Sequence, residues 1–100
     1  MMTIQTKQDG ATLTLAIEGR VDTMTSPQLQ QAVLQAFQSA GKVVLDFAKV
    51  PYISSAGLRV LLIGQKTAQS KSGSMVLTNV GETVQNVLDT VGFSSVMTIE

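Results

Sequence analysis

Hydrophobic and polar residues alternate along two short segments near the start of the chain, residues 3–7 and 12–18. Such alternation places every second side chain on the same face of a β-strand. Residues 8–11 separate the two segments and contain the pair Asp9-Gly10, which is typical of a tight hairpin turn. This part of the chain therefore predicts a β-hairpin.

A helical pattern follows the hairpin. Ser26 and Pro27 are typical of a helix start, with the serine as the cap and the proline in the first turn. Apolar residues then recur at intervals of three and four until Gly41, where we expect the helix to end. The residues of this apolar stripe are Leu29, Val33, Ala36, Phe37 and Ala40.

Strand and helix patterns continue to alternate along the rest of the chain. Residues 43–47 are almost wholly apolar, which is typical of a central strand covered on both faces. The remaining predicted segments are a helix over 58–70, a strand over 75–78, a helix over 82–91 and a short strand or extended tail over 96–99. In the last helix the expected inward residues are Val84, Val87, Leu88 and Val91. This order predicts an α/β fold of α+β character, with a mixed, mostly parallel sheet flanked by helices.

The composition is that of a compact globular protein. The 100 residues are 44% hydrophobic and 14% charged, which predicts one domain over residues 1–100. Seven basic and seven acidic residues cancel, so no excess charge favours nucleic acid or an anionic membrane. The apolar stretches are too short to span a bilayer, and the first ten residues lack the apolar core of a signal peptide. We therefore expect a cytoplasmic protein that binds neither nucleic acid nor membrane.

Most residue types used in catalysis are missing. The chain contains no cysteine and no histidine, which excludes disulfides, thiolate chemistry and every His-dependent triad or zinc site. A phosphate-binding P-loop also fails, because Val43 follows Gly41-Lys42 and Ala36 stands where the first glycine is required. We therefore expect no enzyme activity, and no metal or cofactor bound by the chain itself.

Two adjacent hydroxyl groups lie at a boundary between strand and helix. Ser54 and Ser55 follow the predicted strand over 43–47 and precede the helical pattern that begins at residue 58. Unpaired backbone N–H groups and the positive end of the helix dipole favour an anion there, such as a phosphate added to one of the serines. On spacing alone we favour the simpler interpretation, in which one serine caps the helix.

Residues 46–58 have the sequence Asp-Phe-Ala-Lys-Val-Pro-Tyr-Ile-Ser-Ser-Ala-Gly-Leu. This segment resembles the signature of the bacterial anti-sigma factor antagonists, which are small proteins of the STAS class. That signature runs Asp, apolar, Ser or Ala, a few variable residues, an aromatic residue, Met or Ile, and then Asp-Ser-Ser/Thr-Gly-Leu. Residues 19–22 also resemble the Gly-x-apolar-Asp segment of the family. Ser54 departs from the signature by replacing Asp, and Ala56 by replacing Ser or Thr. The resemblance implies a STAS fold with helices packed largely on one face of the sheet.

The resemblance also implies a function in partner switching. The unphosphorylated protein, a monomer when free, would bind a serine kinase that is itself the anti-sigma factor and that carries ATP and Mg²⁺. Phosphorylation of Ser55, which matches the family's acceptor, would release the kinase, and a PP2C-type phosphatase would restore the unmodified form. For Ser54 we favour a helix cap, or a polar contact in place of the missing Asp, over the role of a rival acceptor. The alternative is a non-switching STAS scaffold subunit of a larger assembly, in which Ser55 is only a cap.

A stripe of side chains after Ser55 is a candidate partner surface. A cation such as Arg59 in the predicted first turn faces an unfavourable helix dipole, so structure alone gives little reason for it. Arg59 lies four residues after Ser55, and helical steps add Leu62 and Lys66 to the same side. We expect this stripe to contact the partner, with Leu62 partly exposed. The alternative is a solvated face with Leu62 at the edge of the core.

Other candidate residues lie in the neighbouring loops. Asp22 has two interpretations of equal weight: a turn residue that binds nearby N–H groups with help from Thr23, or a contact to the kinase near its nucleotide. We expect Asp46 to organise the loop that presents Ser55, and Gly57 to allow tight packing or close approach of a partner. The complete expected partner-binding set is Asp22, Thr23, Ser54, Gly57, Leu58, Arg59, Leu62 and Lys66.

Overall fold

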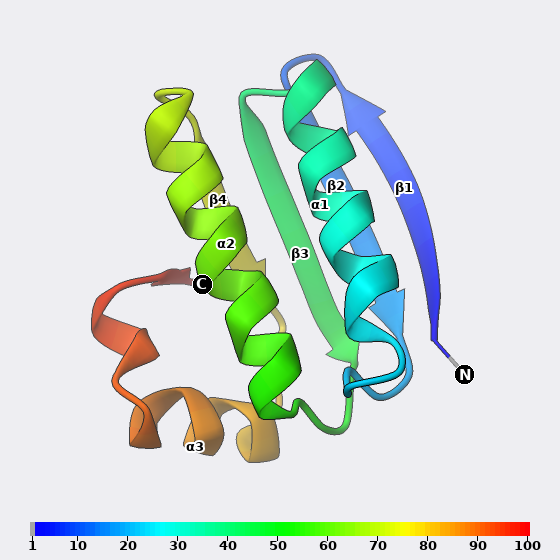
Figure 1. Cartoon of the computed structure of the whole chain (residues 1–100). Coiled ribbons are helices and arrows are strands. Elements are labelled where there is room, and N and C mark those ends of the chain that lie inside the picture. The colour runs from blue at the N-terminus through cyan, green and yellow to red at the C-terminus, as the bar shows by residue number, and fades with distance from the viewer. Residues whose placement is uncertain (1) are drawn as a thin grey trace.

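The computed structural model describes residues 2–100, so Met1 of the expected domain over 1–100 lies outside the described residues. The described residues form a five-stranded sheet and three α-helices (Figure 1). The strands are β1 (Thr3–Asp9), β2 (Thr12–Glu18), β3 (Lys42–Lys49), β4 (Ser74–Thr78) and β5 (Thr98–Ile99). The helices are α1 (Ser26–Ser39), α2 (Ser55–Ser70) and α3 (Glu82–Thr90), with a short 3₁₀ helix, η1 (Phe93–Ser95), before β5.

The strands lie in the order β1-β2-β3-β4-β5. β1 pairs antiparallel with β2, and the three following pairs are parallel. Gly10 closes the predicted hairpin with a φ of 64°, a left-handed conformation that glycine adopts at little steric cost. α1 and α2 form the connections from β2 to β3 and from β3 to β4, because parallel neighbours need a crossover. The predicted mixed, mostly parallel sheet is confirmed.

The core lies between the sheet and the two long helices. α1 and α2 cover the same face of the sheet, as the family resemblance implied, while α3 lies near the N-terminal end of α2 (Figure 1). Leu15, Leu45 and Leu77 enter the core from β2, β3 and β4. Leu29 from α1 and Leu61 from α2 are fully buried in the same cluster. The inward residues predicted for α1 are all buried there as well.

The second face of the sheet is not covered by any helix within residues 2–100 (Figure 1). Along β3, Val43, Leu45 and Phe47 are buried, whereas Val44 and Asp46 point to this second face and are only half-buried. The expectation that this strand is covered on both faces is therefore wrong. Val44 interrupts the alternation of polar and apolar residues, and that made the strand look buried on both sides.

The start of α1 also differs from the prediction. The cap position belongs to Thr25, and Ser26 is the first helical residue. Ser26 is 4% exposed, and its Oγ donates a hydrogen bond to the backbone carbonyl of Asp22 at 2.5 Å. Both residue types suit a cap, so only the preceding turn decides which one takes that position. At the other end, α1 stops at Ser39, and Ala40 is already extended.

The C-terminal segment departs furthest from the prediction. Val84 and Leu88 are buried as expected, but α3 ends one residue early and the Val91 side chain is 47% exposed. Val91 is the C-cap residue, and its amide still donates to the Val87 carbonyl at 3.1 Å; the expectation that its side chain is inward is wrong, and Val87 is half-buried. Residues 93–95 form η1, so the last strand is limited to Thr98–Ile99.

Candidate functional site

Two loops that are far apart in the sequence pair at one end of the sheet. Val21, after β2, and Ile53, before α2, form an isolated parallel bridge. The Val21 amide donates to the Tyr52 carbonyl at 3.0 Å, and the Ser54 amide donates to the Val21 carbonyl at 2.8 Å. The Arg20 guanidinium lies over the Tyr52 ring, 4.6 Å from its centroid, and forms a second link. The loop of Asp22 and the loop of the two serines therefore lie together at one end of the sheet.

Asp22 organises its own loop. Its Oδ1 accepts hydrogen bonds from the amides of Met24 at 3.0 Å and Thr25 at 3.1 Å, and from the Thr25 hydroxyl at 3.2 Å. The Thr25 amide contributes most to lowering the pKa of the Asp22 carboxyl below its ordinary value; the Met24 amide, the Thr25 hydroxyl and the nearby Arg20 charge add to the effect. The hydroxyl that assists the turn therefore belongs to Thr25, and not to Thr23 as expected.

Ser54 and Ser55 have different structural positions. Ser54 is the N-cap of α2, with an extended backbone, and its Oγ accepts a hydrogen bond from the Gly57 amide at 3.4 Å. Ser55 is the first helical residue, and its side chain is exposed. Among the described residues, the Ser55 hydroxyl and the amides of Ser55 and Ala56 have no hydrogen-bond partner. The capping role and the free hydroxyl are thus divided between the two serines.

Gly57 lies beneath the serines, on the bridge between the loops. A Cβ atom added to Gly57 would be 2.7 Å from Cγ1 of Val21 and 2.7 Å from Cγ1 of Ile53. Because real Cβ atoms do not approach other carbons so closely, only glycine lets α2 rest directly on the bridge. Gly57 is buried, so the close approach that it allows is one within the chain.

The helix α2 begins at Ser55, three residues earlier than predicted. Residues 55–57 carry no large apolar side chain, so the hydrophobic period could not reveal this first turn. Arg59 therefore lies in the second turn, and the expectation that it lies in the first turn is wrong. Its conflict with the helix dipole is correspondingly weak, since the dipole effect falls off within the first turn.

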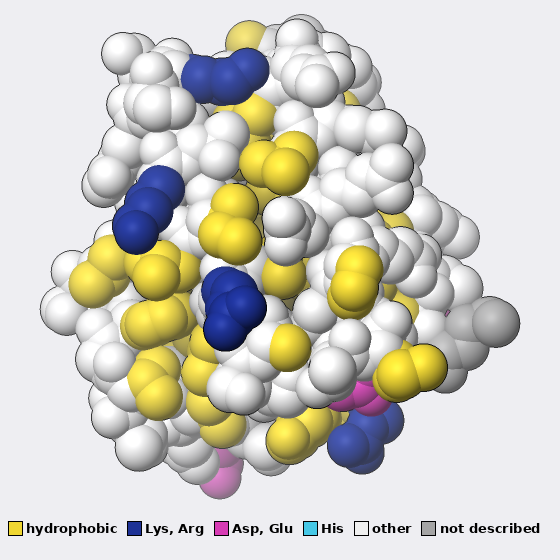
Figure 2. Space-filling model, in the orientation of Figure 1, with side chains coloured by type: hydrophobic (Ala, Val, Ile, Leu, Met, Phe, Trp, Pro, Cys, Tyr) yellow, Lys and Arg dark blue, Asp and Glu magenta, His cyan; other side chains and the backbone are white. Residues whose placement is uncertain are grey.

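The predicted stripe lies on the outer side of α2. Ser55, Arg59 and Lys66 are exposed, and Leu62 is half-buried and packed against the edge of the core, as is Leu58. In Figure 2, hydrophobic side chains gather over the lower part of α2 and beside α3, with basic side chains standing among them. This part of the surface therefore combines apolar and positively charged groups.

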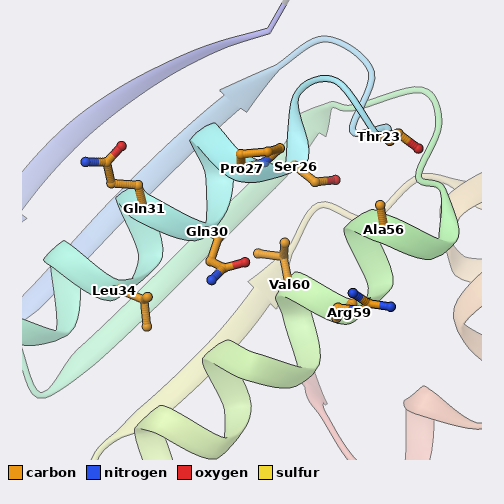
Figure 3. A pocket seen from close by; sticks show the side chains of 9 residues that line it. All are labelled: Thr23, Ser26, Pro27, Gln30, Gln31, Leu34, Ala56, Arg59 and Val60. Atoms are coloured by element: carbon orange, nitrogen blue, oxygen red, sulfur yellow. The ribbon is translucent and has the colours of Figure 1, made fainter.

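A groove of about 410 Å³ runs between the N-terminal halves of α1 and α2. Gln30 from α1 and Val60 from α2 face each other across it, Thr23 and Ala56 lie toward one end, and Arg59 lies along α2 (Figure 3). The sequence interpretation missed the contribution of α1. The signal that could have revealed it is the apolar Leu34, which lies outside the buried stripe of α1 and lines the groove.

The charge of the two helices is one-sided. Neither α1 nor α2 contains an aspartate or a glutamate, whereas α2 contains Arg59 and Lys66. In the part of the chain that the structure describes, Nε of Arg20 forms an ion pair with Oδ2 of Asp22 at 3.9 Å. Arg59 forms no ion pair with any of these residues. The two helices that line the groove therefore contribute positive charge and no carboxylate.

Asp46 does not hold the serine loop. It lies within β3, and its Oδ1 accepts hydrogen bonds from the Ala48 amide and from Nδ2 of Asn79, each at 3.0 Å. The expectation that Asp46 organises the loop of Ser55 is therefore wrong. β3 continues past the apolar residues that defined its predicted end, so Asp46 links β3 to the segment after β4 instead.

Residues 2–100 contain neither a cluster of potential metal ligands nor a helix that could span a membrane. No three His, Cys, Asp or Glu side chains lie close enough together there to hold a metal ion. None of the helices in the same residues is long and apolar enough to cross a membrane.

The chain matches known proteins over nearly its whole length. The family model described as "Mlab, STAS domain" matches residues 4–98. BtrV of Bordetella bronchiseptica, a protein classed as an anti-sigma factor antagonist, is 34% identical over 94 residues, which are 93% of this chain and 80% of BtrV.

Two solved structures share the fold. An anti-sigma factor antagonist from Mycobacterium paratuberculosis has a TM-score of 0.88 at 19% identity, with 99% of this chain and 85% of that chain covered. The Bacillus cell fate determinant SpoIIAA in its phosphorylated form has a TM-score of 0.76 at 19% identity, with 98% and 91% covered.

Proposed function

Because this chain belongs to the STAS-domain family of anti-sigma factor antagonists, we propose that it binds a serine-kinase anti-sigma factor and is released when that kinase phosphorylates Ser55. One observation carries this proposal: the Ser55 hydroxyl is exposed and free of hydrogen bonds at the first position of α2, while Ser54 provides the cap. A kinase can reach the Ser55 hydroxyl without breaking the helix cap.

The N-terminus of α2 suits a phosphate on Ser55. The amides of Ser55 and Ala56 have no acceptor among the described residues, and the helix dipole favours a negative charge at this end. A phosphate adds roughly −1.5 to −2 charges at neutral pH. The added charge therefore changes the surface that the partner meets and leaves the fold intact.

The chemistry belongs to the partners. The kinase, with its bound ATP and Mg²⁺, transfers the γ-phosphoryl group to Oγ of Ser55; the hydroxyl proton passes to a base on the kinase, and ADP leaves. A PP2C-type phosphatase then hydrolyses the phosphoserine with water, which returns serine and inorganic phosphate. This chain, a monomer when free, contributes the hydroxyl and the binding surface and needs no cofactor.

The partner surface consists of the exposed residues around Ser55. Arg59 and Lys66 supply charge, and Leu58 and Leu62 supply apolar contact at the edge of the core. Thr23 extends the surface across the groove to the loop before α1. Asp22 and Gly57 act mainly from within, since one holds its loop and the other seats α2. Ser54 adds a polar atom at the rim while it caps the helix.

Phosphorylation mapping tests the acceptor. A serine kinase recovered on the immobilised protein, supplied with Mg-ATP, should add one phosphate, seen as a single mass increase of the intact protein. Ser55→Ala should abolish the addition, and Ser54→Ala is the matched control that should keep it. A phosphate mapped to Ser54 would contradict the assignment. Stable capture of a partner without any phosphorylation would favour the non-switching scaffold instead.

A further inference from the structure

We propose, on the basis of the function proposed above, that Arg59 is the group through which the Ser55 phosphate releases the partner. In the unmodified protein, the Arg59 guanidinium binds a carboxylate on an apolar segment of the partner that lies in the groove between α1 and α2. After phosphorylation, the same guanidinium pairs with the phosphate of Ser55. The two anions compete for one cation.

The position of Arg59 relative to Ser55 supports the second pairing. The two residues are four apart in α2, and both are exposed, so their side chains extend over the same side of the helix. Within residues 2–100, Arg59 takes part in neither an ion pair nor a hydrogen bond. The guanidinium is therefore available to a new anion, and its planar fork of donors can bind two phosphate oxygens at once.

The groove indicates the chemistry of the partner segment. Arg59 lies along one wall, while Val60 and Leu34 provide apolar lining and Gln30 a neutral polar group (Figure 3). α1 and α2 supply no carboxylate, and the Asp22 carboxylate in the adjoining loop already binds two amides of that loop, so a carboxylate on the partner would complement Arg59. A helix that carries one aspartate or glutamate beside apolar side chains matches both features.

The competition favours the phosphate for two physical reasons. The phosphate is attached to the same helix as Arg59, so it pairs without the loss of translational freedom that the partner's carboxylate incurs. It also carries more negative charge than a carboxylate, and it repels any carboxylate that remains in the groove. Phosphorylation thus removes an attractive contact and adds a repulsive one at the same place.

The ionisation of the phosphate tests the pairing without any partner. Protein with phosphoserine encoded at position 55 is titrated by phosphorus NMR, and the second pKa of the phosphate is compared among variants. Arg59→Gln should raise that pKa, Arg59→Lys should raise it less, and Lys66→Gln, three helical turns from Ser55, should leave it unchanged. An unaltered pKa in Arg59→Gln would overturn the pairing.

A double-mutant cycle tests the competition. Affinity for the captured kinase is measured for the parent and for Arg59→Gln, each with serine or encoded phosphoserine at position 55. We expect phosphorylation to weaken binding by the parent at least ~10-fold, about 1.4 kcal/mol, and to weaken binding by Arg59→Gln by a clearly smaller factor. Equal factors in both proteins would overturn the competition and leave the proposed function standing. If phosphorylation does not weaken binding by the parent at all, the proposed function itself fails.

Discussion

At the scale of single residues, the site depends on contacts that hold it from below. Gly57 lets α2 pack on the bridge formed by Val21 and Ile53. Asp22 ties together the loop that leads into α1. Neither residue needs to touch a partner to affect binding, because each one positions the exposed groups around Ser55. Two predictions concern these supports.

Replacement of Gly57 by alanine should destabilise the fold. The added methyl group overpacks the bridge, at a cost of about 1–3 kcal/mol, and the better helix propensity of alanine offsets about 1 kcal/mol of that. Urea unfolding should therefore give a net loss of about 1 kcal/mol. Gly41→Ala is the matched control, because an added Cβ there has no atom within 4 Å. A Gly57→Ala protein as stable as the control would contradict the packing described.

The Asp22 carboxylate should stabilise the fold in a pH-dependent way. Its pKa is lowered in the folded protein, so its contribution is present above the unfolded pKa, close to 3.8, and is lost as the pH falls through the lower folded value. The free energy of unfolding of the parent and of Asp22→Asn should therefore differ at neutral pH, with the parent more stable. The difference should shrink as the pH falls below the unfolded value. A difference that stays constant throughout this range would show that the charge has no role in the loop.

At the scale of elements, α2 connects the fold to the function. Its first turn contains no acidic residue and its last turn no basic residue, so neither end of its dipole is balanced by its own side chains. Its inner side carries the fully buried Leu61, and its outer side carries the half-buried Leu62. The same helix therefore packs one side on the core and leaves another side partly exposed, so each side can be probed alone.

A phosphate should have different effects at the two ends of α2. On Ser55 it supplies the missing negative charge at the N-terminus and should stabilise the protein by about 0.3–1 kcal/mol, a rise in Tm of a few degrees. On Ser70, the last residue of α2, the same group faces the negative end of the dipole and removes the hydroxyl that donates to the Thr67 carbonyl. Lys66, four residues earlier, offsets part of this cost, so the rise in Tm should be smaller there or absent. Thermal scans of the two encoded phosphoserine proteins measure this difference. A large fall in Tm for the Ser55 form would mean that phosphorylation acts by unfolding the protein.

Two neighbouring leucines of α2 should respond differently to the same substitution. Leu61→Asp places a charge in the core and should cost several kcal/mol, enough to unfold much of the protein. Leu62→Asp should leave the protein folded, with a moderately lower denaturant midpoint, because water can still reach this position. We expect Leu62→Asp to lose kinase binding nevertheless. Normal binding by the folded Leu62→Asp protein would place the partner surface elsewhere, such as the loop of Asp22.

At the scale of the whole molecule, charge is unevenly distributed although the net charge is zero. α1 carries no charged residue, and α2 carries only Arg59 and Lys66. Figure 2 shows few acidic side chains on the side of the molecule formed by these helices. If the partner carries carboxylates on its docking segment, as proposed above, we expect it to be attracted to this side in particular.

The rate of association with the kinase should therefore fall as salt is added. Screening is strong when the Debye length drops from about 10 Å at 0.1 M salt to about 3 Å at 1 M. The dissociation rate should change less, because contacts within a formed interface are poorly screened. Lys66→Gln should slow association at low salt and match the parent at high salt. An association rate that does not depend on salt would show that this charge plays no part in recognition.

Whether a feature can be predicted from the sequence depends on the distance along the chain over which its interactions act. Periodicity identified the hairpin, the buried stripe of α1 and the outer stripe of α2, because these depend on residues a few positions apart. It placed the start of α2 at residue 58 instead of Ser55, since the first turn has no large apolar side chain to mark it. It also predicted, wrongly, that both faces of β3 are covered, because the apolar Val44 does not show on which face of the sheet the helices pack.

By itself, the sequence determined the order of strands and helices, the absence of cysteine and histidine chemistry, and the presence of two hydroxyls at a strand–helix junction. The tertiary structure decided how the two serines are held, because the Val21–Ile53 bridge beneath Gly57 fixes Ser54 at the cap and leaves Ser55 exposed. It alone formed the groove beside Arg59, since α1 and α2 meet only through packing on a common sheet. Local propensities act between near neighbours in the chain, whereas these features arise from contacts between residues about thirty positions apart.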